Sequence, residues 1–285
     1  MVKGHNNCRS TPLVINLGTI QGLGIGPTLH IVMKCDLKSL SAVNILFKFA
    51  DDTTLVVPQN TDCSLNDEFE HIVSWANVNK MVINRAKTKE IVFLRANVRH
   101  DILPCQIDGI ERVLEAKLLG VIFGSKLNFD AHVTQILKVC SQRMYILKQL
   151  AHQGLSVNHL HTICCSIIVS KIMYAACAWG GHISEYLNGK INSLLRRLHR
   201  FGYIKDVRTF DASLAQADFA FFSNIIDGTH CANSLLPPKN PNTVGLRNKG
   251  HKYILPLCKY EAYKQSFIPR CLFNYLKVKA FDNIV

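Results

Sequence analysis

The sequence predicts an α+β protein in which a part that mixes strands and helices is followed by a bundle of helices. Short runs of β-branched and aromatic residues alternate with helical patterns up to about residue 125. Beyond Asn128, apolar residues recur at helical spacing over long segments that few turn signals interrupt. With 285 residues, of which 48% are hydrophobic, the chain can bury the cores that this class requires.

The first predicted elements are a helix and a β-hairpin. Glycines crowd the stretch before Pro27, and proline suits the first turn of a helix because its missing N–H needs no partner there. Two β-rich runs then flank the pair Asp51-Asp52, so we expect a hairpin whose tight turn carries both carboxylates. The expected ranges are 28–40 for the helix, and 44–50 and 53–57 for the strands.

An amphipathic helix and several short strands are expected next. Apolar residues at helical spacing predict a helix over 64–81, with Ser64 as its N-cap. Asp108-Gly109 marks a turn between apolar runs. The strands are expected at 90–94, 102–107 and 117–123.

The second part of the chain is predicted to be helical. Gly154 and Gly180-Gly181 separate three long helical patterns, which favours a small bundle. After Lys205 the pattern weakens. The helices are expected at 130–152, 156–179, 185–201, 211–222 and from 262 onward. The predicted domains are 1–125, 126–204 and a poorly defined C-terminal extension, 205–285.

Composition narrows the class of partner and the compartment. Lysine and arginine total 33 against 20 acidic residues, a formal charge of +13 that favours nucleic acid or an anionic membrane face. The apolar stretch 160–179 is interrupted by Lys171, which favours a buried helix over a membrane span. The polar start does not resemble a secretory signal, and the 11 irregularly spaced cysteines predict reduced, mostly buried thiols. We therefore expect a protein that is intracellular, in the nucleus or the cytoplasm, and not secreted.

The pair Asp51-Asp52 is the sharpest chemical feature. A hairpin turn would hold both carboxylates at a rigid strand end, where hard divalent cations such as Mg²⁺ find oxygen ligands. Phosphoryl or nucleotidyl transfer is the chemistry that such a site suits. Taken alone, an acidic pair is more often an ordinary solvated turn.

Several blocks of sequence surround this pair in a defined order. Phe49-Ala50-Asp51-Asp52 follows Gly18-x-x-Gln21-Gly22-x-x-x-Gly26-Pro27, and the later blocks are Asn84-Arg-Ala-Lys87-Thr88 and Lys117-Leu-Leu-Gly-Val-Ile-Phe123. Together they resemble the reverse transcriptases, or RNA-directed DNA polymerases, of jockey-like non-LTR retrotransposons. The resemblance covers about residues 13–203, through Lys171-Ile-Met-Tyr174 and Ala178-Trp-Gly180. It implies a partial polymerase palm over 1–125 and a helical thumb over 126–204.

The resemblance implies roles for the residues of the palm. Asp51 and Asp52 would hold catalytic magnesium, and Lys87 would neutralise or protonate the departing pyrophosphate. Gln21, Gly22 and Phe49 would lie against the incoming nucleotide and the template. Considered singly, Lys87 is as well explained as a solvated lysine, and Gln21-Gly22 as a plain glycine turn.

The later motifs suggest contacts with a nucleic-acid duplex. On the resemblance, Leu119-Gly120 would belong to the strand pair that grips the primer terminus, although an edge strand with a bulge is the simpler alternative. Arg196 and Arg200 share one helical face, and together with Arg197 they could follow phosphates along a duplex. A solvated basic face explains them equally well. The partners implied are an RNA template, a DNA primer and a full-length element protein, without a membrane.

The chain also departs from the family pattern. Another metal-binding aspartate of the family lies upstream of the Gln-Gly block, so we expect the 285-residue chain to lack polymerase activity by itself. Leu23 replaces a serine and His30 a phenylalanine of the family. Two alternatives stay open: a non-catalytic basic module that binds nucleic acid, and an aggregation-prone chain with an uncovered sheet edge.

Overall fold

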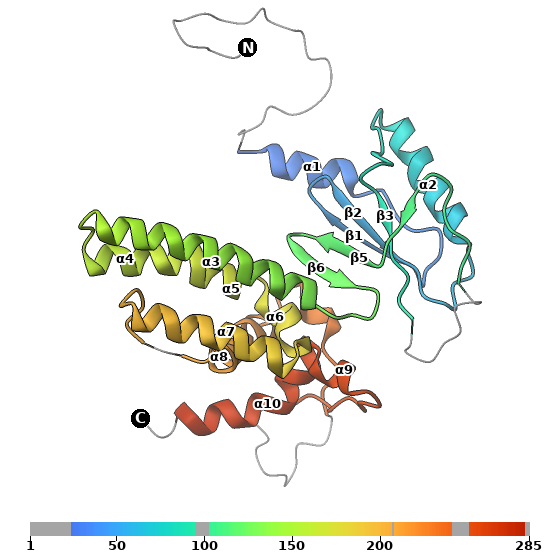
Figure 1. The fold of residues 1–285 in the computed structure, drawn as a ribbon. Helices are drawn as coiled ribbons and strands as arrows, with labels where there is room; N and C mark the ends of the chain where they lie inside the picture. The colour runs from blue at the N-terminus through green and yellow to red at the C-terminus, as the bar shows by residue number, and fades with distance from the viewer. Residues whose placement is uncertain (1–23, 95–102, 207, 241–250, 283–285) are drawn as a thin grey trace, which may run out of the picture. The chain divides into compact units, whose positions relative to one another are not determined.

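The computed structural model describes residues 24–94, 103–206, 208–240 and 251–282, the side chains up to Asn274 (Figure 1). Within this part the chain forms two compact units. Of the described residues, the first unit comprises 24–90 and 103–112, and the second comprises 91–94 and those from 113 onward. Gln21, Gly22 and the glycine-rich block before residue 24 lie outside the described residues.

The first unit begins with a helix and the expected β-hairpin. Helix α1, Gly26–Lys34, has Pro27 in its first turn as expected but ends six residues before the expected limit of 40. Strands β1, Ile45–Phe49, and β2, Asp52–Val56, pair antiparallel. The predicted hairpin is therefore confirmed, but its turn lies one residue earlier than expected, at Ala50-Asp51, and Asp52 is the first residue of β2.

Helix α2, Leu65–Val78, is anchored by polar contacts in its first turn. The backbone N–H of Asp67 donates to the Ser64 hydroxyl at 3.1 Å, which confirms the predicted N-cap. Glu68 is fully buried and accepts hydrogen bonds from Ser41 N and Asn44 Nδ2. Burial opposes its ionisation, but these hydrogen bonds prevail and hold the pKa of Glu68 below its ordinary value.

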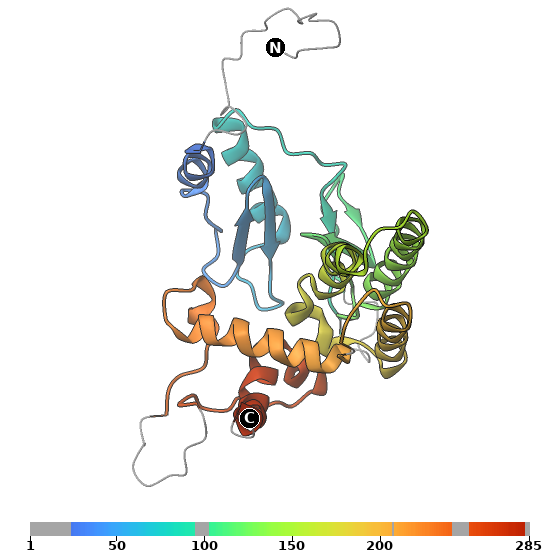
Figure 2. The same cartoon turned by 90° about the vertical axis from the view of Figure 1, so that its left-hand side faces the viewer.

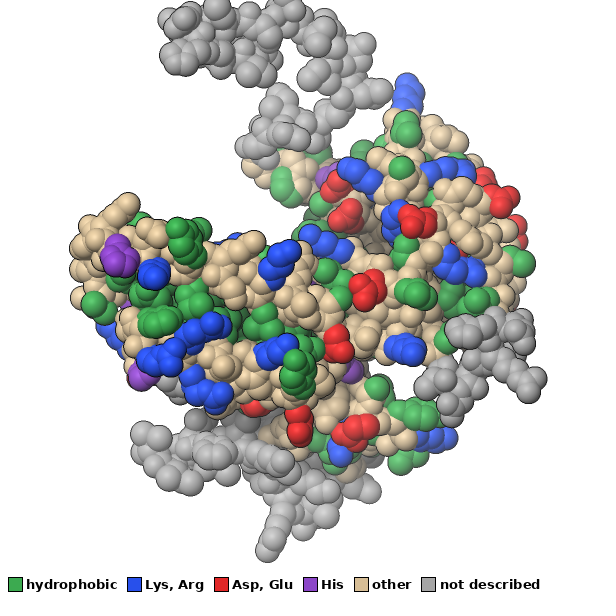
Figure 3. Space-filling view, viewed as in Figure 1, with side chains coloured by type: hydrophobic (Ala, Val, Ile, Leu, Met, Phe, Trp, Pro, Cys, Tyr) green, Lys and Arg blue, Asp and Glu red, His purple; other side chains and the backbone are tan. Residues whose placement is uncertain are grey.

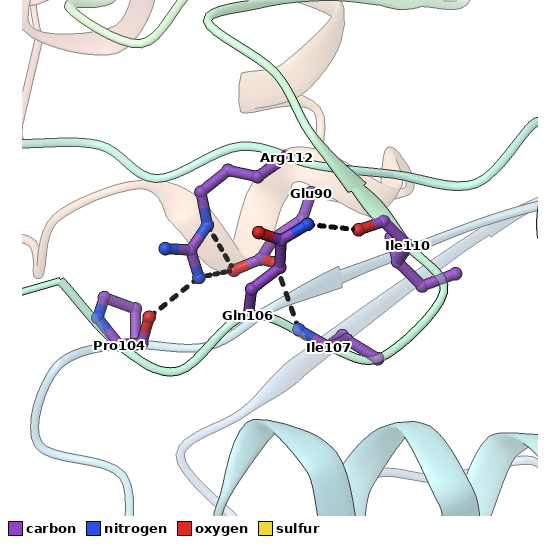
Figure 4. A network of polar contacts seen from close by, with 6 residues as sticks. All are labelled: Glu90, Pro104, Gln106, Ile107, Ile110 and Arg112. Carbon is purple, nitrogen blue, oxygen red and sulfur yellow. Dashed lines mark hydrogen bonds and ion pairs between the residues drawn. The ribbon is translucent and has the colours of Figure 1, made fainter.

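A buried carboxylate organises the rest of this unit. Strands β3, Lys89–Glu90, and β4, Glu111–Arg112, pair parallel. Glu90 lies 8% exposed and receives two hydrogen bonds from the Arg112 guanidinium, which also donates to the Pro104 carbonyl (Figure 4). The predicted strand over 102–107 is wrong where the structure describes it. Residues 103–107 form an irregular segment, because side-chain contacts to Glu90 and Arg112 replace a ladder.

The second unit opens with a hairpin where one strand was expected. Strands β5, Glu115–Leu118, and β6, Val121–Gly124, pair antiparallel on either side of Leu119-Gly120. Both turn residues have positive φ, 45° and 86°, as a two-residue type I′ turn requires. The single strand predicted over 117–123 is thus wrong, because Gly120 provides a turn rather than a bulge.

The long helices of the second unit follow the predicted order. Helix α3, Asp130–His152, has the expected bounds. The stretch predicted as one helix over 156–179 is divided instead into the successive elements α4 (Val157–Cys164), the π-helical η3 (Cys165–Val169), α5 (Ser170–Met173) and α6 (Ala176–Trp179). The break falls at Ala175, which adopts φ 51°. Trp179 Nε1 donates across it to the Tyr174 carbonyl at 3.0 Å.

The C-terminal helices extend this unit rather than forming a separate domain. The elements are η4 (Gly180–His182), α7 (Glu185–Arg200), α8 (Phe210–Ile226), η5 (Cys231–Leu235), α9 (Glu261–Gln265) and α10 (Phe267–Asp282). In Figure 2, α3 and α7 are seen close to end-on, while α8 lies across the view. Trp179 stacks on Phe210 of α8, and both are fully buried in the core shared by α3, α6 and α7.

An ion pair fixes the last helix to the others. Arg270 of α10 donates to both carboxylate oxygens of Asp218 of α8, at 2.8 and 3.0 Å, and also to the Cys177 carbonyl. A Cβ built on Gly181 would lie 2.1 Å from Arg270 Nη1, so this position requires glycine. The compact units therefore differ from the predicted divisions 1–125, 126–204 and 205–285.

One helical stretch of the described chain, Val157–His182, is long and apolar enough to cross a membrane by length and composition alone. Core helices of soluble proteins meet the same criteria. Here a row at four-residue spacing is buried in the core of the unit. Its members are Leu160, Cys164, Ile168, Ile172 and Ala176.

Candidate metal and nucleic-acid sites

The acidic turn is a two-residue connection under backbone strain. Phe49 pairs with Asp52, which leaves Ala50 and Asp51 as the turn residues. Ala50 has φ 49°, a left-handed conformation that costs a residue with a Cβ roughly 1–2 kcal/mol. The chain therefore keeps this turn at an energetic cost that surrounding contacts must offset.

Both carboxylates of the turn are available to a ligand. Asp51 and Asp52 are exposed, and neither side chain accepts a hydrogen bond or forms an ion pair within the described part of the chain. Magnesium binds one or two protein carboxylates together with water and phosphate oxygens, so the pair fits one such ion. A two-metal centre needs more carboxylates, and the described residues hold no group of three potential metal ligands.

Two side chains of helix α1, those of Lys34 and His30, donate hydrogen bonds to backbone carbonyls of the turn. Lys34 is only 7% exposed, and its Nζ donates to the carbonyls of Ala50 and Asp51 at 2.8 and 3.1 Å. His30 Nε2 donates to the same Ala50 carbonyl at 2.6 Å. Burial lowers the pKa of the Lys34 ammonium, while the neighbouring carboxylates of Asp51 and Asp52 oppose this effect. The Lys34 ammonium therefore contacts the backbone of the turn that carries the two carboxylates.

The other predicted palm residues are less closely associated with the carboxylates of the acidic turn. Phe49, on the same hairpin, exposes 63% of its surface, as a stacking role would require. Lys87 is exposed in a turn where its backbone N–H donates to the Asn84 side chain at 3.1 Å. No described contact joins Lys87 to the acidic turn. The predicted nucleotide contacts Gln21 and Gly22 lie outside the described residues.

The hairpin at Leu119-Gly120 is fastened to the helices by a tyrosine. Tyr174 Oη donates to the Leu119 carbonyl at 2.8 Å. A Cβ built on Gly120 would lie 3.3 Å from the same ring. Leu119 remains 43% exposed at the tip of the turn. Tyr174 therefore sets the position of a turn that projects a backbone edge and an apolar side chain.

A buried histidine supports the base of this hairpin. His132 of α3 is 2% exposed, and its Nδ1 accepts a hydrogen bond from Ile122 N of β6 at 3.4 Å. Its Nε2 is buried without a hydrogen-bond partner, and the ring meets Trp179 edge-on at 5.3 Å. Burial above all, with a smaller effect from the charges of Lys171 and Lys117, lowers the pKa of His132 to about 4.

Helix α7 presents an exposed stripe that carries four basic residues and no acidic one. Its opposite face is buried, through residues such as Ile191 and Leu198, and its one acidic residue, Glu185, lies at its first position. The members of the α7 stripe are all exposed: Tyr186, Gly189, Lys190, Ser193, Arg196, Arg197 and Arg200. None of its cations forms an ion pair with a described carboxylate. Figure 3 shows lysine and arginine side chains gathered over this helix.

A pocket of about 460 Å³ lies elsewhere in the second unit, among Gly181, Asp211, Asp218 and Arg270. The side chains of Asp211, Asp218 and Arg270 already bond to one another or to other groups of the protein, which favours a structural role.

Burial raises the pKa of the Cys140 thiol to about 11 and that of Cys164 to about 12. The described cysteines are free thiols, as predicted, but most are exposed or half-buried rather than buried.

The structure thus brings together only part of the predicted site. Phe49, Asp51 and Asp52 share one hairpin, and the three arginines share one helix. Sequence reasoning missed Lys34, because a lysine at the end of an amphipathic helix gives no sign that its ammonium is buried. The role of Tyr174 was missed for a similar reason. Its motif was recognised, but its contact with Leu119 spans 55 residues of sequence.

Comparisons with known proteins agree with the motifs. The chain is 26% identical over 211 residues to an RNA-directed DNA polymerase from the mobile element jockey of Drosophila funebris, covering 68% of the chain and 23% of that protein. It is also 26% identical over 161 residues to a probable RNA-directed DNA polymerase from transposon BS of Drosophila melanogaster, covering 52% of the chain and 18% of that protein. No family model matches the chain, and no solved structure matches it significantly.

The aligned region spans less than a quarter of either relative. The names of both proteins agree with the resemblance that the Phe49–Asp52, Asn84–Thr88 and Lys117–Phe123 blocks indicate, so the predicted recognition is confirmed. The chain is therefore similar in sequence to part of the RNA-directed DNA polymerase of the mobile element jockey and of the probable one of transposon BS.

Proposed function

We propose that the chain is a palm-and-thumb portion of an RNA-directed DNA polymerase that binds a DNA primer paired with an RNA template. In this assignment the first unit corresponds to part of the palm, and the helical unit carries the thumb. The nucleic acid, rather than a membrane, is the partner of its basic surface. A full-length element protein is the further partner that would supply the remaining parts of a polymerase.

The α7 stripe is the observation that carries this proposal. Its four cations, Lys190, Arg196, Arg197 and Arg200, lie on one exposed face that extends over about 21 Å from residue 186 to residue 200. Gly189 and Ser193 lie between them, and a Cβ built on Gly189 would meet nothing within 4 Å. A phosphate backbone could approach this helix closely and meet several cations in succession.

The charges of the stripe are also free for an external anion. Surface arginines in folded proteins commonly pair with neighbouring carboxylates, whereas these have no such partner among the described residues. Lys190 lies over the Tyr186 ring at 4.3 Å, and Arg200 lies 5.4 Å from the Phe201 ring. Exposed aromatic rings of this kind can stack with unpaired bases.

The acidic turn supports the polymerase assignment over a simple binding module. Asp51 and Asp52 would hold a magnesium ion, which neutralises phosphate charge and activates an attacking hydroxyl when it is bound. The turn itself contributes two exposed oxygen donors held on a strained hairpin. We propose that a carboxylate supplied by the remaining parts of a polymerase completes the metal site, so that the isolated chain binds primer and template without extending the primer.

Duplex binding at several salt concentrations tests the role of the stripe. The chain should bind an RNA–DNA hybrid with an affinity that falls steeply with salt. Replacing Arg196, Arg197 and Arg200 together by alanine should lower the slope of log K against log [salt] by about three, roughly one per phosphate contact. The matched control replaces Lys239, Lys252 and Lys259 together by alanine, which removes three exposed charges outside α7. Equal losses in both variants would show non-specific attraction only.

The second candidate function is a non-catalytic module that binds nucleic acid through its net charge of +13. The α7 stripe is compatible with both functions. The two functions predict different effects of removing the Asp51 carboxylate. A binding module would bind nucleic acid equally well, or more tightly, without this negative charge. A polymerase portion would instead lose magnesium-dependent affinity for a primer-template carrying an incoming nucleotide.

A further inference from the structure

We infer that the positive charge of Lys34, which contacts the backbone of the acidic turn, sets how tightly Asp51 and Asp52 bind a divalent metal ion. This inference rests on the proposed metal role of the turn. It adds a residue that lies outside the aspartate pair and acts on the pair through charge. Lys34 is therefore a positioning and affinity-determining residue, since its ammonium bonds to the protein rather than to a substrate.

The geometry makes Lys34 an unusual lysine. It is the last residue of α1, where the helix dipole favours a cation, and only 7% of its surface is exposed. Its ammonium donates to two carbonyls of a two-residue turn, those of Ala50 and Asp51, at 2.8 and 3.1 Å. A lysine on a solvated helix would keep its charged end in water. Lys34 instead directs its ammonium to the backbone carbonyls of the turn that carries the two carboxylates.

Neighbouring contacts keep Lys34 in this position. Lys48 of β1 donates to the carbonyls of Lys34 and Leu37, at 2.6 and 2.7 Å, and so ties the end of α1 to the hairpin. His30 shares the Ala50 carbonyl with the Lys34 ammonium. The positive charge therefore cannot move away from the turn without breaking several hydrogen bonds.

The charge has a direct consequence for metal binding. The Lys34 ammonium attracts the carboxylates of Asp51 and Asp52 and repels any divalent cation that they bind. A unit charge roughly 6–8 Å from a divalent ion, in a medium as polarisable as water, weakens its binding by about five- to tenfold. The same ammonium also stabilises the strained Ala50 conformation, so the turn stays formed when no metal is bound.

Manganese binding, followed by the electron paramagnetic resonance signal of free Mn²⁺, tests the inference without relying on activity. Lys34→Gln, which keeps a donor but removes the charge, should bind Mn²⁺ about five- to tenfold more tightly than the wild-type chain. Lys34→Arg should match the wild type. Lys38→Gln, which removes an exposed charge that makes no contact with the turn, is the matched control and should also leave the affinity unchanged.

The outcomes separate this inference from the proposed function. If the wild-type chain binds Mn²⁺ and Lys34→Gln binds it equally, Lys34 does not set the affinity, but the metal site stands. If no variant binds Mn²⁺ better than Asp51→Asn with Asp52→Asn, the proposed metal site itself is wrong. Circular dichroism checks the fold, and Lys34→Met provides a second neutral variant. Unfolding of both neutral variants would make Lys34 a stabilising residue only and overturn its role in affinity.

Discussion

The buried His132 should make the stability of the helical unit depend on pH in a way that a single substitution removes. Neutral His132 accepts the Ile122 N–H through Nδ1 and contacts the Trp179 ring. Protonation would remove the acceptor and place a charge in an apolar core, near the ammonium groups of Lys171 and Lys117. Acid should therefore loosen the attachment of the β5–β6 hairpin to α3.

The size of the effect follows from the shift in pKa. The pKa of His132 is about 4 in the folded chain, against an ordinary value of 6.5. Between these values the unfolded chain binds more protons, so the free energy of unfolding rises with pH over this window. At 1.36 kcal/mol per pH unit, about 3 kcal/mol of stability should be lost as the pH falls from about 6.5 to about 4.

Urea denaturation at several pH values measures this dependence. His132→Leu should be less stable than the wild type at pH 7, by about 1 kcal/mol for the lost hydrogen bond. Below pH 6.5 its free energy of unfolding should fall by about 3 kcal/mol less than that of the wild type. His159→Leu, at an exposed histidine of α4, is the matched control and should retain the wild-type slope. Parallel curves for the wild type and His132→Leu would show that His132 does not cause the pH dependence.

Two further substitutions test other parts of the fold. Arg270→Met should lower the free energy of unfolding by about 3–5 kcal/mol, because it leaves the Asp218 carboxylate buried without its partner. Adding Asp218→Leu should recover part of this loss in urea denaturation, and a larger loss in the double variant would contradict the explanation. Ala50→Gly should raise the free energy of unfolding by about 0.5–1 kcal/mol by relieving the left-handed strain. A destabilised Ala50→Gly variant would show that the methyl group makes contacts worth more than the strain.

The fold could be predicted where local pattern and capping agree. The acidic hairpin, Ser64 as an N-cap and α3 were found because each has a periodic apolar pattern with a clear start or end. The segment 103–107 was mistaken for a strand, since an apolar run gives no sign that Glu90 and Arg112 will hold it as a loop. The break at Ala175 likewise depends on packing that is remote in sequence.

The site could be predicted only where residues act through local motifs. The aspartate pair and the α7 arginines follow from order and helical spacing alone. Lys34 and Tyr174 act on turns 16 and 55 residues away, through hydrogen bonds to backbone carbonyls that any residue could supply. Because the accepting groups carry no side-chain signature, these contacts appear only when the chain is folded.

Primer extension on an RNA template with magnesium tests whether the isolated chain carries a complete polymerase site. The wild-type 285-residue chain and Asp51→Ala should both bind the primer-template, and neither should extend the primer. Extension should appear when the remainder of a jockey-type polymerase is joined to the wild-type chain, and Asp51→Ala should abolish it. Extension by the isolated chain that Asp51→Ala abolishes would contradict our account of an incomplete metal site. Extension by the completed polymerase that survives Asp51→Ala would contradict the role of the acidic turn.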